Sequence, residues 1–448
     1  TMTAQQKQTQ LYFFLAWLLT SSVLLLRSWQ EIATPAMLFE DRHFLLPLYF
    51  NQHQISSIFS EHLGYASVGP QLLAFLIGYL PLTWAPYAYA ASSLMLCALA
   101  FSVFALPQFH ALCTNPRHRV LICLLMAILP LGRTPLVSNI TYSEFNVLFI
   151  LVMLVSTSTF RRANILLDGI IIPLCIASHP ASITLMPLYL LNIYFGDQKQ
   201  KLQQLCWIGI TVLYIQFLVD HSSTETMDFD YILLRLLLAA TAFAGKVMVE
   251  PWIGGYASSD MFRNGNFFDV GHAYMANGIL VGLLFIIYAT FFLGWHTAKK
   301  QRRESMVYMI VLTGFGVLYL SMLTRLNGWG WAAHVQEPFL QRYVYVARLC
   351  SLVFFCCIIS AWLEQHIQWR KIIGFVVLMV FVFAMRSGIN NRWLYGPDIA
   401  ASTALLHFLD QVGNEIDDGN HACREKKDCI RTLEPDSRWP VVLDLSEH

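Results

Sequence analysis

The run Glu40–His43 places two carboxylates, a guanidinium and an imidazole next to one another, inside an otherwise apolar stretch that follows the first hydrophobic segment. Apolar flanks would hold these groups at a membrane surface, where the loss of hydration raises the pKa of a carboxyl group. A carboxylate in that setting can accept a proton from an attacking hydroxyl or amine. The alternative is that Asp41 caps a helix beginning near Phe44, and the charge pattern alone favours neither.

A second polar patch, residues 135–146, joins two later apolar segments. Asn139, Glu144 and Asn146 offer donors and acceptors that suit sugar hydroxyls. Helix capping is the alternative, and it is favoured for Asn139. The turn after the next apolar segment contains His179. A histidine in such a turn more often caps a helix or packs against neighbours than contacts a substrate, and a substrate contact is the functional alternative.

A third stretch, residues 324–348, is basic and aromatic. An arginine inside a membrane segment is costly and is a functional candidate by default, and a guanidinium matches the geometry of a phosphate. The predicted phosphate-binding residues are Arg325, His334, Arg342 and Arg348, with Tyr343 beside them as a substrate contact. The alternative is that these side chains only anchor the chain at lipid head groups.

Composition indicates what must position these residues. The chain has 448 residues, of which 56% are hydrophobic and 13% charged, whereas an ordinary globular domain is about a quarter charged. The mean hydropathy is +0.52. These values exclude a soluble enzyme, a disordered chain and a coiled coil, and they predict an all-α polytopic membrane protein. The formal net charge of +1 gives no reason to expect a nucleic-acid partner.

Apolar segments long enough to approach the roughly 20 residues of a membrane span recur along the chain. Eleven spans are predicted: Leu11–Leu26, Tyr87–Leu106, Val120–Leu136, Phe145–Phe160, Ala163–Ile176, Ala181–Tyr194, Leu202–Val219, Ala273–Trp295, Ser305–Leu323, Tyr343–Leu363 and Ile372–Met385. Two further apolar segments, Val68–Leu82 and Tyr231–Val249, are expected to lie along the outer face as amphipathic helices. The alternative is that they are ordinary spans.

Orientation follows from lysine and arginine in short loops. Five basic clusters fall on one side of the eleven-span arrangement: Arg117/Arg119, Arg161/Arg162, Lys199/Lys201, residues 299–303 and Arg370/Lys371. That side is expected to be the cytoplasm, with the N-terminus there and the C-terminus periplasmic. A transmembrane domain, residues 1–386, then carries outer loops 29–83, 220–272 and 324–342.

The segment 387–448 is expected to be a short extracytoplasmic C-terminal tail. It is hydrophilic and contains Cys423 and Cys429. On an oxidising outer side, two cysteines six residues apart could form a disulfide. Two free thiols are equally compatible with the sequence.

One layout unites these observations: a short cytoplasmic end, a span, an outer loop with an acidic pair close behind it, a proline-led amphipathic helix, and a second span with a basic cytoplasmic end. It resembles the N-terminal module of the GT-C superfamily of membrane glycosyltransferases, which includes protein O-mannosyltransferases and the aminoarabinose transferase of lipid A. The resemblance covers residues 1–200 most strongly. It implies that the catalytic acid matches Glu40 or Asp41, with Asp41 preferred. Arg42 and His43 stand where many relatives have glycine.

The resemblance also extends to function. The patch around Asn139 resembles an asparagine-rich turn of bacterial members, and Arg342-Tyr343 resembles their late periplasmic loop, whose basic residues hold the phosphate of a polyprenyl-phosphate sugar. It implies transfer of that sugar to a glycan, lipid or protein acceptor, in a bacterial inner membrane. The substrate contacts expected from the patches above are His43, Asn139, Glu144, His179 and Tyr343. Some relatives use a divalent cation, but the sequence shows only scattered carboxylates and no ligand cluster.

Two other classes of function stay open. A transporter or flippase of a lipid-linked glycan would be expected to carry charged or helix-breaking residues near the middle of spans and an internal repeat. Neither is clear in the sequence, whose polar groups gather at the outer face. A ligase or polymerase of lipid-linked glycans would share the basic outer loop but needs no acidic residue after the first span, so Glu40-Asp41 favours the transferase. Motifs for nucleotide binding, including a Walker motif and a dinucleotide fingerprint, are absent from the sequence, so an energy-coupled pump has no support.

Overall fold

The computed structural model describes residues 4–33, 35, 55–59, 67–129, 137, 139–161, 164–221, 243, 247, 301–325, 341–365, 430–433 and 441–444. The longer elements are α1 (Ala4–Arg27), α4 (Val68–Ile77), α5 (Ala85–Ser102), α6 (Pro116–Ile128), α8 (Ser143–Ser156), α10 (Met186–Phe195), α11 (Gln198–His221), α16 (Gln301–Arg325) and α18 (Gln341–Gln365). The short helices are α2 (Trp29–Ala33), η2 (Ile55–Phe59), η3 (Leu82–Trp84), η4 (Val103–Ala105), η5 (Pro107–Ala111), η6 (Ser158–Phe160), η7 (Leu167–Ile171), α9 (Ile172–Ile176) and η8 (Pro180–Leu185).

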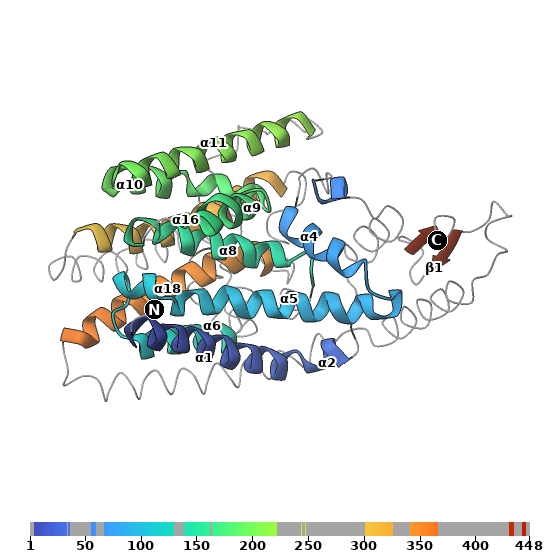
Figure 1. Cartoon of the computed structure of the whole chain (residues 1–448), viewed down its shortest axis with the longest axis horizontal. Helices are drawn as coiled ribbons and strands as arrows, with labels where there is room; N and C mark the ends of the chain where they lie inside the picture. The colour runs from blue at the N-terminus through green and yellow to red at the C-terminus, as the bar shows by residue number, and fades with distance from the viewer. Residues whose placement is uncertain are drawn as a thin grey trace, which may run out of the picture.

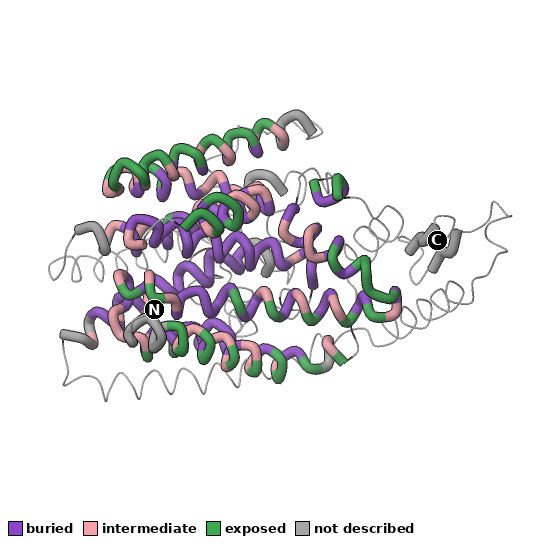
Figure 2. Tube along the Cα trace, in the orientation of Figure 1, coloured by how far each residue is buried: buried purple, intermediate pink, exposed green. Residues whose placement is uncertain are grey.

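The long helices run along a common direction and form a bundle with α8 near its centre (Figure 1). Every residue of α8 is buried. A helix that is apolar on all sides is expected in the middle of such a bundle rather than at its surface. Figure 2 shows the same arrangement, with buried residues in the central helices and exposed residues along α1, α10 and α11.

The outer helices expose large apolar side chains. On α1, Leu18 and Leu26 are 63% and 73% exposed, and on α11 Leu213 is 71% exposed. Exposed apolar surface on this scale marks contact with a membrane or a partner. Together with the length of the helices, it indicates a helical membrane protein.

Three helical segments within the described residues are long and apolar enough to cross a membrane: Gln10–Arg27, Leu82–Ala105 and Val344–Ala361. They confirm the predicted helices Leu11–Leu26, Tyr87–Leu106 and Tyr343–Leu363. Five shorter apolar helices coincide with other predicted segments, namely Val68–Ile77, Ser143–Ser156, Leu167–Ile176, Pro180–Phe195 and Ser305–Leu320. The predicted spans Ala273–Trp295 and Ile372–Met385 lie outside the described residues, and so does nearly all of Tyr231–Val249.

The segment predicted to lie on the outer face, Val68–Leu82, contains the helix α4, which has 10 residues. That length is half of the roughly 20 residues that a span needs. The helix buries Val68, Gln71 and Phe75 against the bundle, whereas Tyr79 beyond its end is 68% exposed.

Polar contacts fix the first helices. The Thr20 hydroxyl of α1 lies 3.0 Å from the Ser102 hydroxyl of α5. At the end of α1, Arg27 Nη1 donates to the carbonyls of Ala127 and Leu129, at 3.3 and 3.2 Å. A cation at the C-terminal end of a helix satisfies carbonyls that lack intrahelical partners, so Arg27 caps α6.

The helices α16 and α18 approach each other closely at Gly314. A Cβ atom added to Gly314 would lie 2.8 Å from the Cβ of Cys350 and 3.2 Å from the Cα of Ala347. Small residues at a helix contact allow this approach in membrane proteins. The contact holds the helix that carries Arg348 against the bundle.

The C-terminal segment departs from the all-α prediction. Strands β1 (Ile430–Leu433) and β2 (Val441–Asp444) pair antiparallel, with Ile430 opposite Asp444. The β-branched residues Val441 and Val442 and the apolar ends of β1 suit a strand, a signal too short to stand out from the polar tail. Cys423 and Cys429 lie outside the described residues, so their disulfide stays a prediction.

Candidate functional site

Polar side chains from three separate segments meet at one end of the bundle, called here the Glu144 end. The contributing segments are the start of α4 with Ser67, the first turn of α8 with Glu144, and the turn between α9 and η8 with Ser178 and His179. All four residues are buried. The sequence predicted two of them, Glu144 and His179, and the structure brings these two together.

Glu144 is the charged centre of this cluster. Its side chain is 4% exposed, and its Oε2 accepts a hydrogen bond from the Ser67 hydroxyl at 3.1 Å. Its other oxygen, Oε1, lies 3.8 Å from Nε2 of His179. Because Glu144 stands in the first turn of α8, the positive end of the helix dipole favours its charged form.

The backbone fixes the orientation of the His179 ring. Nδ1 of His179 accepts a hydrogen bond from the backbone N–H of Ala181 at 3.0 Å. A neutral imidazole that accepts at Nδ1 carries its proton on Nε2, so the N–H faces Glu144. The ring also packs against Phe145, with centroids 4.9 Å apart. His179 is therefore held as a donor directed at the carboxylate.

Ser178 ties α4 to the same turn. The backbone N–H of Gly69 donates to the Ser178 hydroxyl at 2.8 Å. A Cβ atom at position 69 would meet that hydroxyl at 3.0 Å and the Val147 side chain at 3.3 Å. The close approach is therefore possible only because Gly69 has no side chain. It places Ser67 next to Glu144.

Asn139 supports the loop that leads into α8. Its Oδ1 accepts a hydrogen bond from the backbone N–H of Tyr142 at 2.8 Å, and its carbonyl accepts one from the Ser93 hydroxyl of α5, also at 2.8 Å. Asn139 therefore closes the turn before α8 and does not cap the helix, whose N-cap is Tyr142 without a side-chain cap. A substrate contact for Asn139 stays a prediction.

A second polar contact links the Glu144 end to α18. The Tyr345 hydroxyl donates to Oδ1 of Asn146 at 2.8 Å, and the thiol of Cys97 lies 3.5 Å from the same hydroxyl. Arg348 follows Tyr345 by about one turn of α18 and is 1% exposed. The sequence singled out Arg348 as a charge inside a span, and the structure buries it in the bundle.

The remaining predicted residues have no described side chain. Glu40, Asp41, His43 and His334 lie outside the described residues. Arg325 ends α16, and Arg342 and Tyr343 begin α18, where the structure describes the helix but not these side chains. The ends of α16 and α18 that carry them point to the Glu144 end of the bundle (Figure 1).

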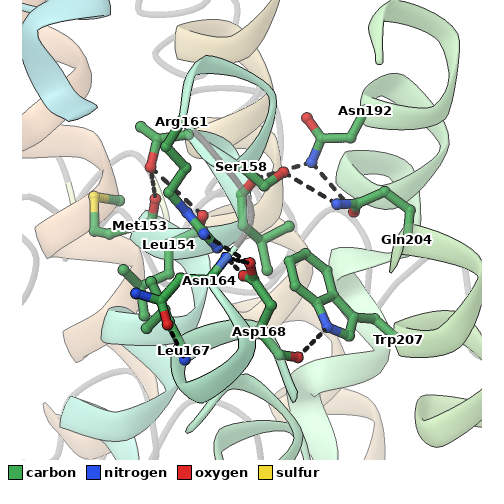
Figure 3. A network of polar contacts seen from close by, with 12 residues as sticks. Met153, Leu154, Ser158, Arg161, Asn164, Leu167, Asp168, Asn192, Gln204 and Trp207 are labelled. Atoms are coloured by element: carbon green, nitrogen blue, oxygen red, sulfur yellow. Dashed lines mark hydrogen bonds and ion pairs between the residues drawn. The ribbon is translucent and has the colours of Figure 1, made fainter. Parts of the chain in front are cut away.

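A different polar network occupies the opposite end, called here the Arg161 end (Figure 3). Arg161 and Asp168 form a bidentate ion pair, with Nη1 2.9 Å from Oδ2, and their side chains are 8% and 9% exposed. The backbone N–H of Asn164 donates to Asp168 at 2.7 Å. Asn192 and Gln204 continue the network toward Ser158.

A tryptophan completes this network by satisfying a carbonyl that the helix leaves open. Residues Leu167–Ile171 form a π-helical turn, in which the carbonyl of Asp168 would bond the N–H of Pro173. Proline has no N–H. Nε1 of Trp207 instead donates to the Asp168 carbonyl at 3.0 Å. The sequence analysis missed this network, although an aspartate inside the predicted span Ala163–Ile176 is the signal that could have found it.

Ser67 was also missed, because nothing local pairs it with a carboxylate 77 residues away. The sequence analysis also missed Tyr214 of α11, which interacts electrostatically with Glu144. Here too the two residues are far apart in the sequence. Within the part of the chain that the structure describes, no group of three or more His, Cys, Asp or Glu residues could hold a metal ion.

The Glu144 end combines a buried carboxylate, a histidine N–H directed at it and a serine hydroxyl. Such a set can orient a hydroxylated ligand through charge-assisted hydrogen bonds or exchange a proton with it. The chain matches no protein-family model, and neither a curated protein nor a solved structure matches it.

Proposed function

We propose that this protein is a GT-C-like membrane glycosyltransferase, which moves a sugar from a polyprenyl-phosphate donor to an acceptor hydroxyl at the Glu144 end. The observation that carries the proposal is the convergence of Glu144, His179 and Ser67 at the end of the bundle where the helix of Arg348 begins. Carboxylate, imidazole and hydroxyl groups suit a sugar, and arginines suit a phosphate.

In this mechanism Asp41, with Glu40 beside it, takes the proton of the acceptor hydroxyl. The acceptor oxygen then attacks the anomeric carbon, and the bond from that carbon to the phosphate oxygen breaks with inversion. The lipid phosphate leaves with the electron pair. Positive groups at the leaving oxygen stabilise the developing charge, a role assigned to Arg325, His334, Arg342 and Arg348. Glu144 and His179, with His43, Asn139 and Tyr343, orient the sugar and the acceptor.

The test is to purify the protein in mild detergent and to identify co-purifying lipids by mass spectrometry. Wild type is expected to retain a polyprenyl phosphate or its sugar ester, and the double variant Arg342→Ala/Arg348→Ala is expected to lose it. The matched control is Arg117→Ala, which removes an exposed arginine at the Arg161 end. Size-exclusion chromatography checks that the variants remain folded.

The same lipid can be offered with a mixture of acceptors in an activity assay. Sugar transfer by wild type and its loss in Asp41→Asn would support the proposed base. Retention of ordinary phospholipids alone by both wild type and the double variant would count against the donor site.

A transporter of a lipid-linked glycan is the second candidate, and one observation favours it. Asp168 lies inside the predicted span Ala163–Ile176, in a π-helical turn followed by Pro173. Charged and helix-breaking residues within spans are typical of transport sites. Movement of a fluorescent lipid-linked sugar across proteoliposomes without any transfer to an acceptor would favour this function over the transferase.

A further inference from the structure

Arg119 lies at the Arg161 end, away from every residue assigned to the proposed reaction. It stands one turn into α6, whose first residue is Pro116, and it is 3% exposed. Within the described part of the chain, neither Nε nor Nη1 of Arg119 has a hydrogen-bond acceptor. A buried charge of this kind needs a compensating partner.

Other buried or half-buried arginines have such partners. Arg161 is paired with Asp168, and Arg27 donates to two backbone carbonyls of α6. Burial lowers the pKa of Arg119, yet a guanidinium keeps its proton in proteins. Arg119 therefore presents a positive charge whose Nε and Nη1 donors have no acceptor among the described residues.

The surroundings of Arg119 favour an anion. The groups that interact with it electrostatically are the thiols of Cys113 and Cys123, and a thiol does not supply the negative charge that an arginine needs. The first turn of α6 adds the positive end of a helix dipole. Its N–H groups are partly used, because Pro116 has none and that of Arg117 donates to Oδ1 of Asn115 at 3.0 Å. Arg117, in the same turn of α6, adds a further positive charge and is exposed.

The neighbouring surface indicates where the anion comes from. Nδ1 of His118, which lies between the two arginines in the sequence, is 2.8 Å from the Ser360 hydroxyl of α18. This contact ties α6 to α18, so the proposed anion contact is assigned to Arg119 and not to His118. On the same helix, Leu121 is 42% exposed, on the side opposite to Arg119, so α6 borders the apolar surroundings of the bundle. A buried cation in the first turns of such a helix suits a molecule with an acyl chain and a negatively charged head group.

We propose that Arg119 and the first turn of α6 bind the phosphate group of an anionic lipid at the Arg161 end of the bundle. The ligand chemistry is a phosphate monoester or diester held by the Arg119 guanidinium near the positive end of the α6 dipole. This site is separate from the donor site of the proposed function, because the predicted donor residues belong to the Glu144 end.

The experiment measures binding of phosphatidylglycerol and of phosphatidylcholine to the full chain by native mass spectrometry. Wild type is expected to bind one phosphatidylglycerol at least tenfold more tightly than phosphatidylcholine. Arg119→Gln is expected to lose that preference. Arg117→Ala, which removes an exposed charge from the same helix, is expected to change the affinity by less than threefold.

Thermal unfolding distinguishes the sources of the phosphate. Stabilisation of wild type by phosphatidylglycerol but not by millimolar inorganic phosphate identifies a lipid head group. Stabilisation by inorganic phosphate that Arg119→Gln abolishes supports the same anion site with a soluble ligand. Equal binding of phosphatidylglycerol by wild type and Arg119→Gln would overturn the proposal.

A measurement on wild type alone covers the case in which Arg119→Gln does not fold. Hydrogen exchange of the backbone amides at residues 117–121 is expected to slow when phosphatidylglycerol replaces phosphatidylcholine. Unchanged exchange in this turn would contradict binding there, whatever the behaviour of the variant.

Discussion

The two ends of α8 each hold a buried carboxylate, but the two carboxylates have different kinds of partner. At the Arg161 end, Asp168 is bound by a permanently charged arginine and by a backbone N–H, within 3 Å. At the Glu144 end, Glu144 faces a histidine whose charge depends on protonation, across 3.8 Å, and a serine hydroxyl. A carboxylate held by arginine and backbone suits a structural role, whereas one next to a histidine and a hydroxyl can still change partners.

The difference teaches that burial of an acidic group is not enough to identify a working site. Both carboxylates are less than 10% exposed. What separates them is the chemistry of the partner, because a histidine can gain or lose a proton near neutral pH and an arginine cannot. Variants at the two ends should therefore affect different observables, stability at one end and sugar transfer at the other.

The largest effect is expected for Asp168→Ala. Removal of the carboxylate leaves Arg161 buried without its counter-charge, which costs about 3–5 kcal/mol of the free energy of unfolding. Thermal or denaturant unfolding in detergent measures the loss. The double variant Arg161→Met/Asp168→Leu is the control and should recover most of the stability. Wild-type stability in Asp168→Ala would show that the ion pair is not structural.

Glu144→Gln should separate function from stability. Glutamine keeps an oxygen that accepts from Ser67 but removes the charge that faces His179. Sugar transfer is expected to fall about 10- to 100-fold, the value of one charge-assisted hydrogen bond, with little change in the unfolding midpoint. Asp197→Asn, an exposed neutralisation at the start of α11, is the matched control. A large drop in stability with unchanged turnover would show that Glu144, like Asp168, has a structural role.

Trp207→Phe tests the π-helical turn at the Arg161 end. Phenylalanine preserves most of the packing but leaves the carbonyl of Asp168 without its donor. A buried, unsatisfied carbonyl costs about 1–3 kcal/mol. The unfolding midpoint should fall while sugar transfer per folded molecule stays constant. Tyr189→Phe, a nearby buried aromatic change, serves as the control for packing.

The smallest effect is expected for Ser67→Ala. Loss of this donor to Glu144 should cost about 1.5 kcal/mol of stability, the lower end for a hydrogen bond to a charged group, because the contact is long at 3.1 Å. If Ser67 also orients Glu144 for substrate, the KM for the donor lipid should rise as well. Restoration of KM by Ser67→Thr, which returns the hydroxyl, distinguishes orientation from packing. An unchanged KM in Ser67→Ala would limit Ser67 to a role in the fold.

Apolar length along the chain was enough to predict the helices that form α1, α5 and α18, because a run of apolar residues is a local property. Residue type alone also singled out Glu144, His179 and Arg348, because a charged or titratable side chain stands out in an apolar context. The structure buries all three side chains. The short helices around Asp168 and Pro180 were harder to define, since proline and a π-helical turn divide them within a continuous apolar pattern.

The sequence by itself determined that this chain builds apolar helices and that its polar side chains collect at their ends, because hydrophobic burial and the cost of unpaired charge act on each segment alone. The tertiary structure decided which of these side chains are partners. Ser67 reaches Glu144 only because Gly69 allows α4 to contact Ser178, and Trp207 meets Asp168 only because α11 packs beside the π-helical turn. Such pairs depend on contacts between distant segments, which no local pattern of residues specifies.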